Sequence, residues 1–312
     1  MPGIYYNGGA QITVLTERLA KPFLKWAGGK GQLLTEIERR LPKGLKTGEI
    51  DTYVEPFVGG GAVFFHLAQR YENIKRFYLF DINNDLVNCY KAVKKDVGLL
   101  VRELLSLQDK FLELNSPKRK EFYLDIRKEF NLEKLSGFGI KTAAKLIFLN
   151  KNCYNGLYRV NRKGEFNVPF GDYKSPRICA AKNLQNASGI LQIAKIIYAD
   201  FTHSERYIDN HTFVYLDPPY RPLSPTASFT SYSKEDFDEA KQIRLAQFCR
   251  QIHGKGAKFL LSNSDPKNED LEDHFFENQY GCFKIERVKA NRAINCKASG
   301  RGQINELLIT NY

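Results

Sequence analysis

The spacing of hydrophobic and polar positions divides the chain into two kinds of region. Near both ends, short β-branched and aromatic runs alternate with helical periodicity, which is typical of buried strands joined by helices. Between about residues 86 and 150, amphipathic and charge-laced helices replace this alternation. We expect strands at residues 52–57, 76–80, 192–200, 212–216, 257–261, 283–288 and 306–309. Strands on both sides of a helical insertion predict an α/β sheet domain that carries an inserted domain.

The segment at residues 151–171 has a different pattern. Asn-Gly and Lys-Gly pairs stand between aromatic-rich arms, which predicts a β-hairpin. Basic and aromatic side chains alternate through this segment and just beyond it: Lys151, Tyr154, Tyr158, Arg159, Arg162, Lys163, Phe166, Tyr173 and Lys174. Basic groups suit phosphates and base edges, and aromatic rings can wedge or stack between bases. A hairpin that contacts nucleic acid is therefore preferred to a plain exposed hairpin.

A strand expected at residues 212–216 is ended by two prolines. Asp217 and Tyr220 flank Pro218 and Pro219 at its carboxyl end, where open α/β sheets hold their chemistry. Prolines lack an N–H, so the backbone presents carbonyl acceptors beside a carboxylate. Such a pocket accepts hydrogen bonds from the amino group of a nucleobase, and Tyr220 offers a face for stacking. The alternative is a rigid turn without chemistry.

Two glycine-rich turns suggest a nucleoside cofactor. Residues 58–62 join an expected strand to a helix, and the following strand ends in Asp81, twenty residues after Gly61. An acid at this distance reaches ribose hydroxyls in dinucleotide-binding folds. Residues 26–30 carry the chain's single tryptophan and end in Gly-Gly-Lys before another helix, which favours contact with an anionic group although the spacing is not that of a phosphate-binding Walker loop. A nicotinamide-dependent oxidoreductase would share these turns.

Composition narrows the class of protein. The net charge of +12 over 312 residues favours a polyanionic partner, and basic residues also gather between the last two expected strands at Arg292, Lys297 and Arg301. The six cysteines never form Cys-x-x-Cys and the histidines lack ligand spacing, so neither a disulfide framework nor a metal site is expected. No apolar run reaches the length of a membrane span and no signal peptide is recognised, so a cytoplasmic location is expected.

Five stretches together resemble the Dam family of DNA adenine-N6 methyltransferases, the D12 class with its alpha order of motifs. They are residues 23–30 (FLKWAGGK), 54–61 (VEPFVGGG), 81–86 (DINNDL), 153–171 (CYNGLYRVNRKGEFNVPFG) and 217–220 (DPPY). The block at 153–171 discriminates best, because glycine turns and DPPY occur in other methyltransferases. The resemblance covers most of the chain beyond residue 20.

This resemblance implies the fold and its division into domains. The expected fold is a doubly wound, mostly parallel α/β sheet of the S-adenosylmethionine-dependent methyltransferase type, with an inserted target-recognition domain of helices and a β-hairpin. The expected division places an N-terminal arm at residues 1–20, the catalytic domain at 21–90 and 188–312, and the DNA-binding domain at 91–187.

The resemblance also assigns residues. Those implied to bind the cofactor S-adenosylmethionine are Trp26, Lys30, Phe57, Gly59, Asp81, Asp200, Phe201 and Asp217. Those implied in catalysis are Asp217, Pro218, Pro219 and Tyr220. Those implied to contact DNA are Lys25, Tyr154, Asn155, Arg159, Pro169, Tyr173 and Lys174, with Arg159 at a base edge and Tyr154 and Asn155 as an intercalating tip. The chain departs from some members at Asp172, where they carry a basic residue, which puts contact at that edge of the target site in doubt.

The activity implied is methyl transfer from S-adenosylmethionine to N6 of an adenine flipped out of duplex DNA, within the family's usual site GATC. Asp217 and the Pro218 carbonyl would hold the amine while Tyr220 stacks on the base. Three alternatives stay open: an RNA base methyltransferase, a nicotinamide-dependent oxidoreductase, and a DNA-binding protein with a vestigial pocket. A partner restriction endonuclease, a role in repair or regulation, and a phage origin are equally compatible with the sequence.

Overall fold

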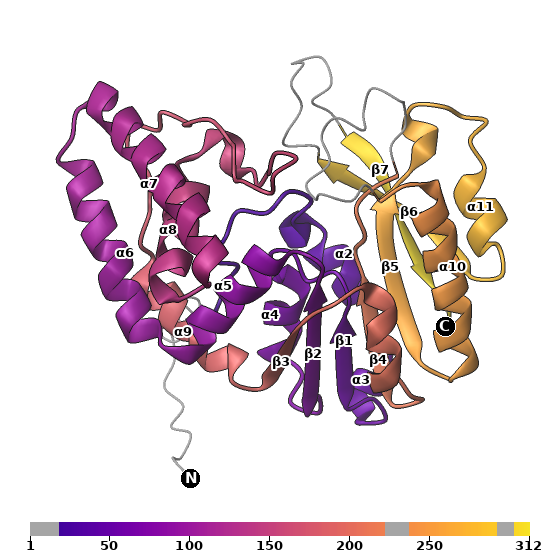
Figure 1. The fold of residues 1–312 in the computed structure, drawn as a ribbon. Helices are drawn as coiled ribbons and strands as arrows, with labels where there is room; N and C mark the ends of the chain where they lie inside the picture. The colour runs from indigo at the N-terminus through magenta and orange to yellow at the C-terminus, as the bar shows by residue number, and fades with distance from the viewer. Residues whose placement is uncertain (1–18, 222–236, 292–302) are drawn as a thin grey trace, which may run out of the picture.

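The computed structural model describes residues 19–221, 237–291 and 303–312, and in these ranges the chain forms a single mixed sheet flanked by helices (Figure 1). The predicted N-terminal arm, apart from its last two residues, and the basic loop with Arg292, Lys297 and Arg301 lie outside the described ranges. The strands are β1 (Thr52–Glu55), β2 (Arg76–Asp81), β3 (Ala194–Tyr198), β4 (Thr212–Leu216), β5 (Lys258–Ser264), β6 (Lys284–Asn291) and β7 (Gln303–Thr310).

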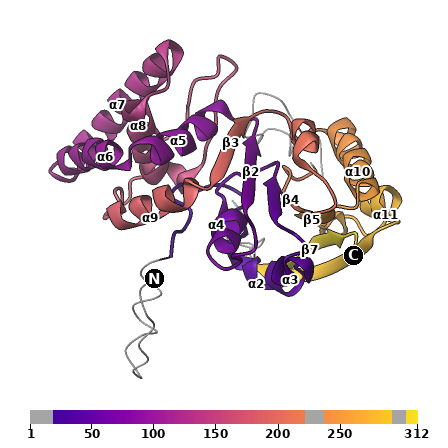
Figure 2. The same ribbon diagram turned by 90° about the horizontal axis from the view of Figure 1, so that it is seen from below.

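The helices fall into three groups. On one face of the sheet lie α2 (Leu34–Arg39), α3 (Gly44–Thr47) and α4 (Ala62–Ala68), and on the other α10 (Glu239–Gly254) and α11 (Phe275–Tyr280) (Figure 2). A third group stands beside β3: α5 (Asn84–Lys95), α6 (Val97–Leu112), α7 (Ser116–Ser136), α8 (Ile140–Asn152) and α9 (Ala181–Leu191). Short 3₁₀ helices are η1 (Lys30–Gln32), η2 (Tyr154–Gly156), η3 (Phe201–Tyr207) and η5 (Pro266–Asn268).

The strand order is β3-β2-β1-β4-β5-β7-β6. The first five strands of this order pair in parallel, and β7 runs antiparallel to both β5 and β6. The chain moves outward from β1 through β2 to β3, then returns to β4 beside β1 and moves outward to β5. This reversal confirms the doubly wound, mostly parallel sheet, and it places the topological switch point between β1 and β4.

Six of the seven expected strands differ from the observed strands at one end or both, and the differences at β1 and β5 have a clear physical cause. β1 stops at Glu55 instead of residue 57, because Pro56 has no N–H to give to the ladder. β5 continues three residues beyond the expected 261, through Ser264, because its polar end pairs with β7, with Ser262 opposite Leu308 and Ser264 opposite Glu306. In the sequence, polar residues at the end of a strand cannot be told from a loop. In the structure, pairing with a neighbouring strand keeps them in the sheet.

Alternate strand residues enter two hydrophobic clusters on opposite faces. Tyr53 and Tyr215 join the cluster beneath α4, whereas Val54, Val214 and Leu216 join the cluster beneath α10. The period of two follows from strand geometry, and the burial of both faces explains why these strands read as continuous apolar runs. The first cluster continues without a break into α5–α9, so the sheet and the helical group share one core.

The segment predicted as a β-hairpin forms an antiparallel loop without regular strands. Its arms meet at isolated bridges, Cys153 with Phe170 and Val160 with Phe166. Carbonyl groups of its second arm accept hydrogen bonds from α7 side chains instead of from a continuous partner strand. Tyr123 Oη donates to Val168 O at 2.8 Å and Asn131 Nδ2 to Phe166 O at 3.0 Å. We call residues 153–171 the recognition loop.

Candidate functional site

The two motifs predicted to carry chemistry lie at one edge of the sheet. β1 and β4 are parallel neighbours with Val54 opposite Val214, so the glycine turn after β1 and residues 217–220 after β4 leave the sheet side by side. Carboxyl ends of adjacent strands at a switch point form the crevice in which α/β proteins bind ligands. The segment carrying Lys30 also reaches this edge.

A buried ion pair joins Lys30 to Asp217. Lys30 Nζ lies 2.6 Å from Asp217 Oδ1, and the side chains are 4% and 19% exposed. Burial is the largest single influence and would lower the pKa of Lys30, but the charge and hydrogen bond of Asp217 together with the charges of Tyr220 and Glu306 outweigh burial and hold that pKa above its ordinary value. Burial raises the pKa of Asp217, and the Lys30 ammonium opposes the rise. Lys30 therefore stays charged, and its ammonium favours the ionised form of Asp217 at the crevice.

The same ammonium orients Tyr220. Lys30 Nζ donates to Tyr220 Oη at 3.0 Å and to Gly28 O at 3.0 Å. The Tyr220 hydroxyl in turn donates to Glu306 on β7, with contacts of 3.0 and 2.9 Å to its two carboxylate oxygens. Tyr220 is thus held on both sides of its hydroxyl, which fixes the position of that end of the ring.

Asp217 keeps one oxygen for a ligand. Within the described ranges its partners bind Oδ1, where Ser262 Oγ donates at 3.2 Å in addition to Lys30. Gln242 Nε2 donates to the Pro219 carbonyl at 2.9 Å, which fixes the turn. Asp217 Oδ2 is thus left as an acceptor at the crevice, next to the Pro-Pro turn.

The glycine turn after β1 is tied to the end of β2. Gly59 N donates to Asp81 Oδ2 at 3.1 Å, and Asn83 N donates to Asp81 Oδ1 at 2.8 Å. Burial raises the pKa of Asp81 to about 6, and these backbone donors oppose the rise. Gly59 has φ 47°, and a Cβ there would lie 3.0 Å from Trp26 Cδ1, so glycine permits both the turn and the close approach of the indole.

A second aromatic group borders the crevice. Phe57 stacks on Phe201 with ring centroids 5.5 Å apart, and Phe237 contacts both rings. Phe201 is buried, so most of its surface belongs to the core beneath α10. Asp200 caps η3 through Thr202 N at 3.1 Å and pairs with Arg244 at 3.0 Å, so at least one of its oxygens is already engaged.

Sequence reasoning missed Glu55, Ser262, Gln242 and Glu306. Glu55 is buried under the crevice, where burial raises its pKa well above the ordinary value and Tyr53 Oη donates to it at 2.9 Å. Burial therefore favours the protonated form of this carboxyl group. Its position directly before Pro56 in a matched motif was a usable signal. Ser262 and Glu306 had none, because only strand pairing brings β5 and β7 to Asp217 and Tyr220.

Some of the aromatic residues predicted to contact DNA are exposed on the recognition loop, whereas others are buried. Tyr154 is 54% exposed, and its backbone N donates to Pro169 O at 2.9 Å, which brings these two predicted DNA contacts together where the two arms of the loop begin and end, beside the bridge of Cys153 with Phe170. Asn155 adopts a left-handed conformation with φ 54°, which produces the tight turn. Tyr158 and Phe166, expected among the wedging aromatics, are instead buried, because the loop packs them against α5 and α7.

The remaining predicted DNA contacts surround this loop. Arg159 is exposed, and its Nε donates to Asn167 Oδ1 at 2.8 Å. Lys25 is anchored through its backbone by Asn150, and its ammonium lies 4.7 Å from the ring centroid of Tyr173. Lys174 is exposed, while its carbonyl accepts a bond from Arg119. All these residues come from segments that border α8.

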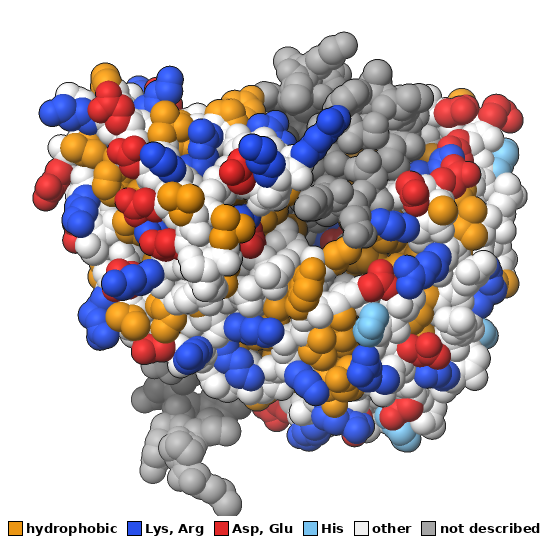
Figure 3. All heavy atoms as spheres, in the orientation of Figure 1, with side chains coloured by type: hydrophobic (Ala, Val, Ile, Leu, Met, Phe, Trp, Pro, Cys, Tyr) orange, Lys and Arg blue, Asp and Glu red, His pale blue; other side chains and the backbone are white. Residues whose placement is uncertain are grey.

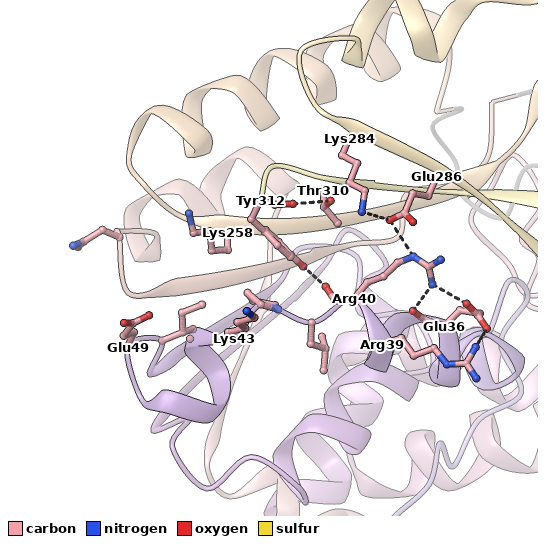
Figure 4. Close-up of a pocket in the computed structure, with 15 residues that line it drawn as sticks. Glu36, Arg39, Arg40, Lys43, Glu49, Lys258, Lys284, Glu286, Thr310 and Tyr312 are labelled. Atoms are coloured by element: carbon pink, nitrogen blue, oxygen red, sulfur yellow. Dashed lines mark hydrogen bonds and ion pairs between the residues drawn. The ribbon is translucent and has the colours of Figure 1, made fainter.

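A separate cavity lies at the opposite edge of the sheet (Figure 4). It measures about 760 Å³ and is lined by residues at the amino ends of β5 and β6 and the carboxyl end of β7, including Lys258, Lys284 and Thr310. Arg40 bonds both Glu36 and Glu286 inside it, so several of its charges are already paired. It contains none of the predicted site residues.

Among the described residues, no group of three or more His, Cys, Asp or Glu side chains is arranged to hold a metal ion. Among the same residues, no helix has both the length and the apolar character needed to cross a bilayer.

Known proteins were compared with the chain. A family model described as D12 class N6 adenine-specific DNA methyltransferase matches residues 26–294. A type II methyltransferase of Methanocaldococcus jannaschii, M.MjaIII, is 55% identical over 293 residues, which cover 94% of this chain and 99% of that protein. The type II methyltransferase M1.LlaDCHI of Lactococcus lactis is 38% identical, covering 94% and 95%. A DNA adenine methylase of Vibrio cholerae is 36% identical, covering 92% and 95%.

Proposed function

Because the chain belongs to the D12 class of N6 adenine-specific DNA methyltransferases, we propose that it uses S-adenosylmethionine and acts on an adenine flipped out of duplex DNA within GATC. The observation that carries this proposal is the meeting of Lys30, Asp217 and Tyr220 at the switch point, next to the Gly59–Asp81 turn. The family excludes the oxidoreductase and RNA alternatives.

The residues beside the switch point fit this cofactor. Asp81 bonds backbone N–H groups only, so its carboxylate retains acceptor sites for hydroxyl groups. Trp26 and the Phe57–Phe201 pair offer ring faces. We assign cofactor binding to Trp26, Lys30, Phe57, Gly59, Asp81, Asp200, Phe201 and Asp217. When bound, S-adenosylmethionine supplies a methyl group on a cationic sulfonium whose thioether leaves as a neutral group.

Asp217 and Pro218 prepare the nucleophile. The lone pair of adenine N6 is delocalised into the ring, and it becomes available when the N6 hydrogens are held out of the ring plane. Asp217 Oδ2 and the Pro218 carbonyl accept those two hydrogens and stabilise the positive charge that develops on N6. A preorganised group of this kind lowers the barrier by about 2.7–4 kcal/mol. Lys30 contributes by keeping Asp217 ionised, and Tyr220 by stacking on the base.

The recognition loop supplies the DNA contacts. Tyr154 and Asn155 at the exposed turn enter the base stack beside Pro169, and Arg159 reads a base edge. Flipping an adenine costs a few kcal/mol of stacking and pairing, which the inserted side chains and the Tyr220 face offset. Lys25, Tyr173 and Lys174 contact the backbone. We accordingly assign residues 91–187 to target recognition, and residues 21–90 and 188–312 to catalysis.

The names of the relatives bear on two parts of the proposal, the target site GATC and a partner endonuclease. Some relatives are named DNA adenine methylase, and two are named type II methyltransferase. We propose GATC as the site and protection of host DNA as the role. The carboxylate of Asp172 accepts a bond from Ser116 Oγ at 2.8 Å. Because some family members carry a basic residue here, this is the position through which the target sequence of the chain can depart from GATC.

The test uses radiolabelled S-adenosylmethionine with two duplexes, one containing GATC and one with its adenine replaced. We expect label on the first only, and Asp217→Ala should abolish transfer while circular dichroism shows a folded protein. Label on both duplexes would refute GATC. Wild-type rates from the Asp217→Ala variant would refute the assigned catalytic role.

A further inference from the structure

Tyr158 links the recognition loop to the cofactor side of the crevice. It belongs to the loop but is only 5% exposed. Its ring stacks on Trp26 with centroids 5.3 Å apart and planes at 27°. Its hydroxyl donates to Asp85 Oδ2 at 2.7 Å. Tyr158 therefore supports the indole that we assign to cofactor binding, from the side of the DNA-binding segment.

Asp85 is shared between Tyr158 and the outer turn of the loop. It lies in the first turn of α5, four residues after Asp81, and the same Oδ2 accepts a bond from Lys134 Nζ at 2.9 Å. Lys134 on α7 also donates to Gly164 O at 2.6 Å. Because one oxygen holds both donors, a shift of Lys134 changes the position or strength of the Tyr158 bond.

Gly164 closes a turn at residues 161–164 that carries two exposed cationic side chains. Gly164 N donates to Asn161 O at 2.8 Å, and the intervening Arg162 and Lys163 are exposed. These side chains are placed to meet phosphates. A continuous set of contacts thus runs from this turn through Lys134, Asp85 and Tyr158 to Trp26, which packs against the glycine turn at Gly59.

We propose that Tyr158 is a positioning residue that couples DNA contact at the 161–164 turn to cofactor binding at Trp26, so that each ligand strengthens binding of the other. DNA that fixes the turn fixes Gly164 O, Lys134 and Asp85, and the Tyr158 ring then holds Trp26 in its stacking position before the cofactor arrives. Linkage requires the effect to be reciprocal and equal in both directions. This inference rests on the proposed cofactor and DNA sites.

Three variants separate this coupling from ordinary support of the fold. Tyr158→Phe keeps the ring against Trp26 and removes the bond to Asp85. Lys134→Met breaks the link at the other side of Asp85 without touching Trp26. Tyr123→Phe is the control, because it removes another buried hydroxyl that bonds the same loop, at Val168 O, with no contact to Trp26 or Asp85.

The experiment measures the Kd of S-adenosylhomocysteine by calorimetry with and without unmethylated plasmid fragments, which contain every short target site. Trp26 is the chain's single tryptophan, so tryptophan fluorescence reports its surroundings directly. We expect the wild type and Tyr123→Phe to bind the nucleoside about 5-fold or more tightly with DNA. For Tyr158→Phe and Lys134→Met the ratio should approach one, with an unchanged Kd in the absence of DNA.

The DNA-induced change in Trp26 fluorescence should be lost in the same two variants. A wild-type ratio of one, or an undiminished ratio in both variants, would overturn the coupling while leaving the proposed function intact. Failure of the wild type to bind S-adenosylhomocysteine at all would overturn both. A variant that is merely destabilised would weaken both affinities and leave their ratio unchanged, which also counts against the proposal.

Discussion

At the scale of single residues, the site depends on the interactions that stabilise charged side chains at a buried edge of the sheet. Lys30, 2.6 Å from Asp217, opposes the rise in pKa that burial causes there, whereas Glu55, buried nearby with a tyrosine hydroxyl as donor, has its pKa raised well above the ordinary value. Two buried carboxyl groups in one region thus differ in how strongly the ionised form is favoured. The difference arises from their partners, since an ammonium stabilises a carboxylate whereas burial without a cation favours the acid.

The rate of methyl transfer by the wild type should fall at low pH as Asp217 becomes protonated, and Ser262→Ala should shift the pH at which this fall occurs. Transfer requires ionised Asp217, and the Ser262 bond lowers the pKa of that carboxyl. Removing the bond raises the pKa, so the acid limb of the rate profile should move upward by about one pH unit, with an unchanged plateau. Ser264→Ala, on the same strand without contact to Asp217, is the control. An identical acid limb in both variants would show that Ser262 does not tune Asp217.

Gly59 provides a second prediction at this scale. Its φ of 47° disfavours a side chain, and a Cβ would press on Trp26 Cδ1 at 3.0 Å. Gly59→Ala should weaken cofactor binding at least about tenfold, because strain of 1–3 kcal/mol falls on the pocket wall. Gly60→Ala is the matched control, since its Cβ would meet Trp26 Cβ at an easier 3.4 Å. Titration with S-adenosylhomocysteine measures both, and equal affinities would contradict the role given to Gly59.

At the scale of elements, α7 determines the shape of the recognition loop. Asn131 both accepts from Phe166 N at 2.8 Å and donates to Phe166 O at 3.0 Å, as a neighbouring strand would. A helix side chain therefore replaces strand pairing. This explains why turn signals correctly predicted where the chain reverses, while the regular hairpin between them did not form.

Asn131→Ala should loosen this loop. It removes two hydrogen bonds to Phe166 and leaves a buried backbone pair without partners, at a cost of about 2 kcal/mol. We expect DNA binding to weaken about tenfold, measured by fluorescence anisotropy with a labelled duplex. The Kd of S-adenosylhomocysteine without DNA should not change. A loss of cofactor affinity equal to that of DNA affinity would indicate general destabilisation instead.

At the scale of the whole molecule, basic side chains from distant segments meet beside the loop. Although the chain carries a net charge of +12, Lys and Arg are spread over the face seen in Figure 3, with acidic side chains among them. Lys151 at the end of α8 differs from these basic side chains in its pKa. Burial, together with the positive charges of Lys25 and Arg177, lowers its pKa to about 8. A phosphate placed there would relieve the repulsion.

DNA affinity should therefore fall as pH rises through 8. Below that pH Lys151 is already charged, whereas above it binding must add a proton, which weakens binding up to tenfold per pH unit. Lys151→Met should bind DNA more weakly at pH 7 and lose this extra pH dependence, and its salt slope should fall by about one. Lys182→Met, on the exposed surface of α9, is the control. A wild-type affinity that is flat between pH 7 and 9 would exclude Lys151 from the interface.

The sequence by itself determined the parts whose physics is local. The prolines after residue 216 end β4 wherever it lies, glycines permit the turn at 59–61, and the alternation of apolar runs and helical periods specifies an α/β sheet. The same local signals identified Asp217, Tyr220, Asp81 and Lys30 as candidates. Each of these predictions depends on residues that are neighbours in the chain.

Only the tertiary structure decided which groups act together. Lys30 meets Asp217 across nearly two hundred residues, and Glu306 reaches Tyr220 because β7 pairs antiparallel with β5. The burial of Tyr158 against Trp26 follows from packing of the loop on α5 and α7, and nothing in its aromatic neighbourhood distinguishes it from exposed Tyr154. The physical reason is that burial and ion pairing are properties of the folded chain, in which strand order and helix packing set the distances.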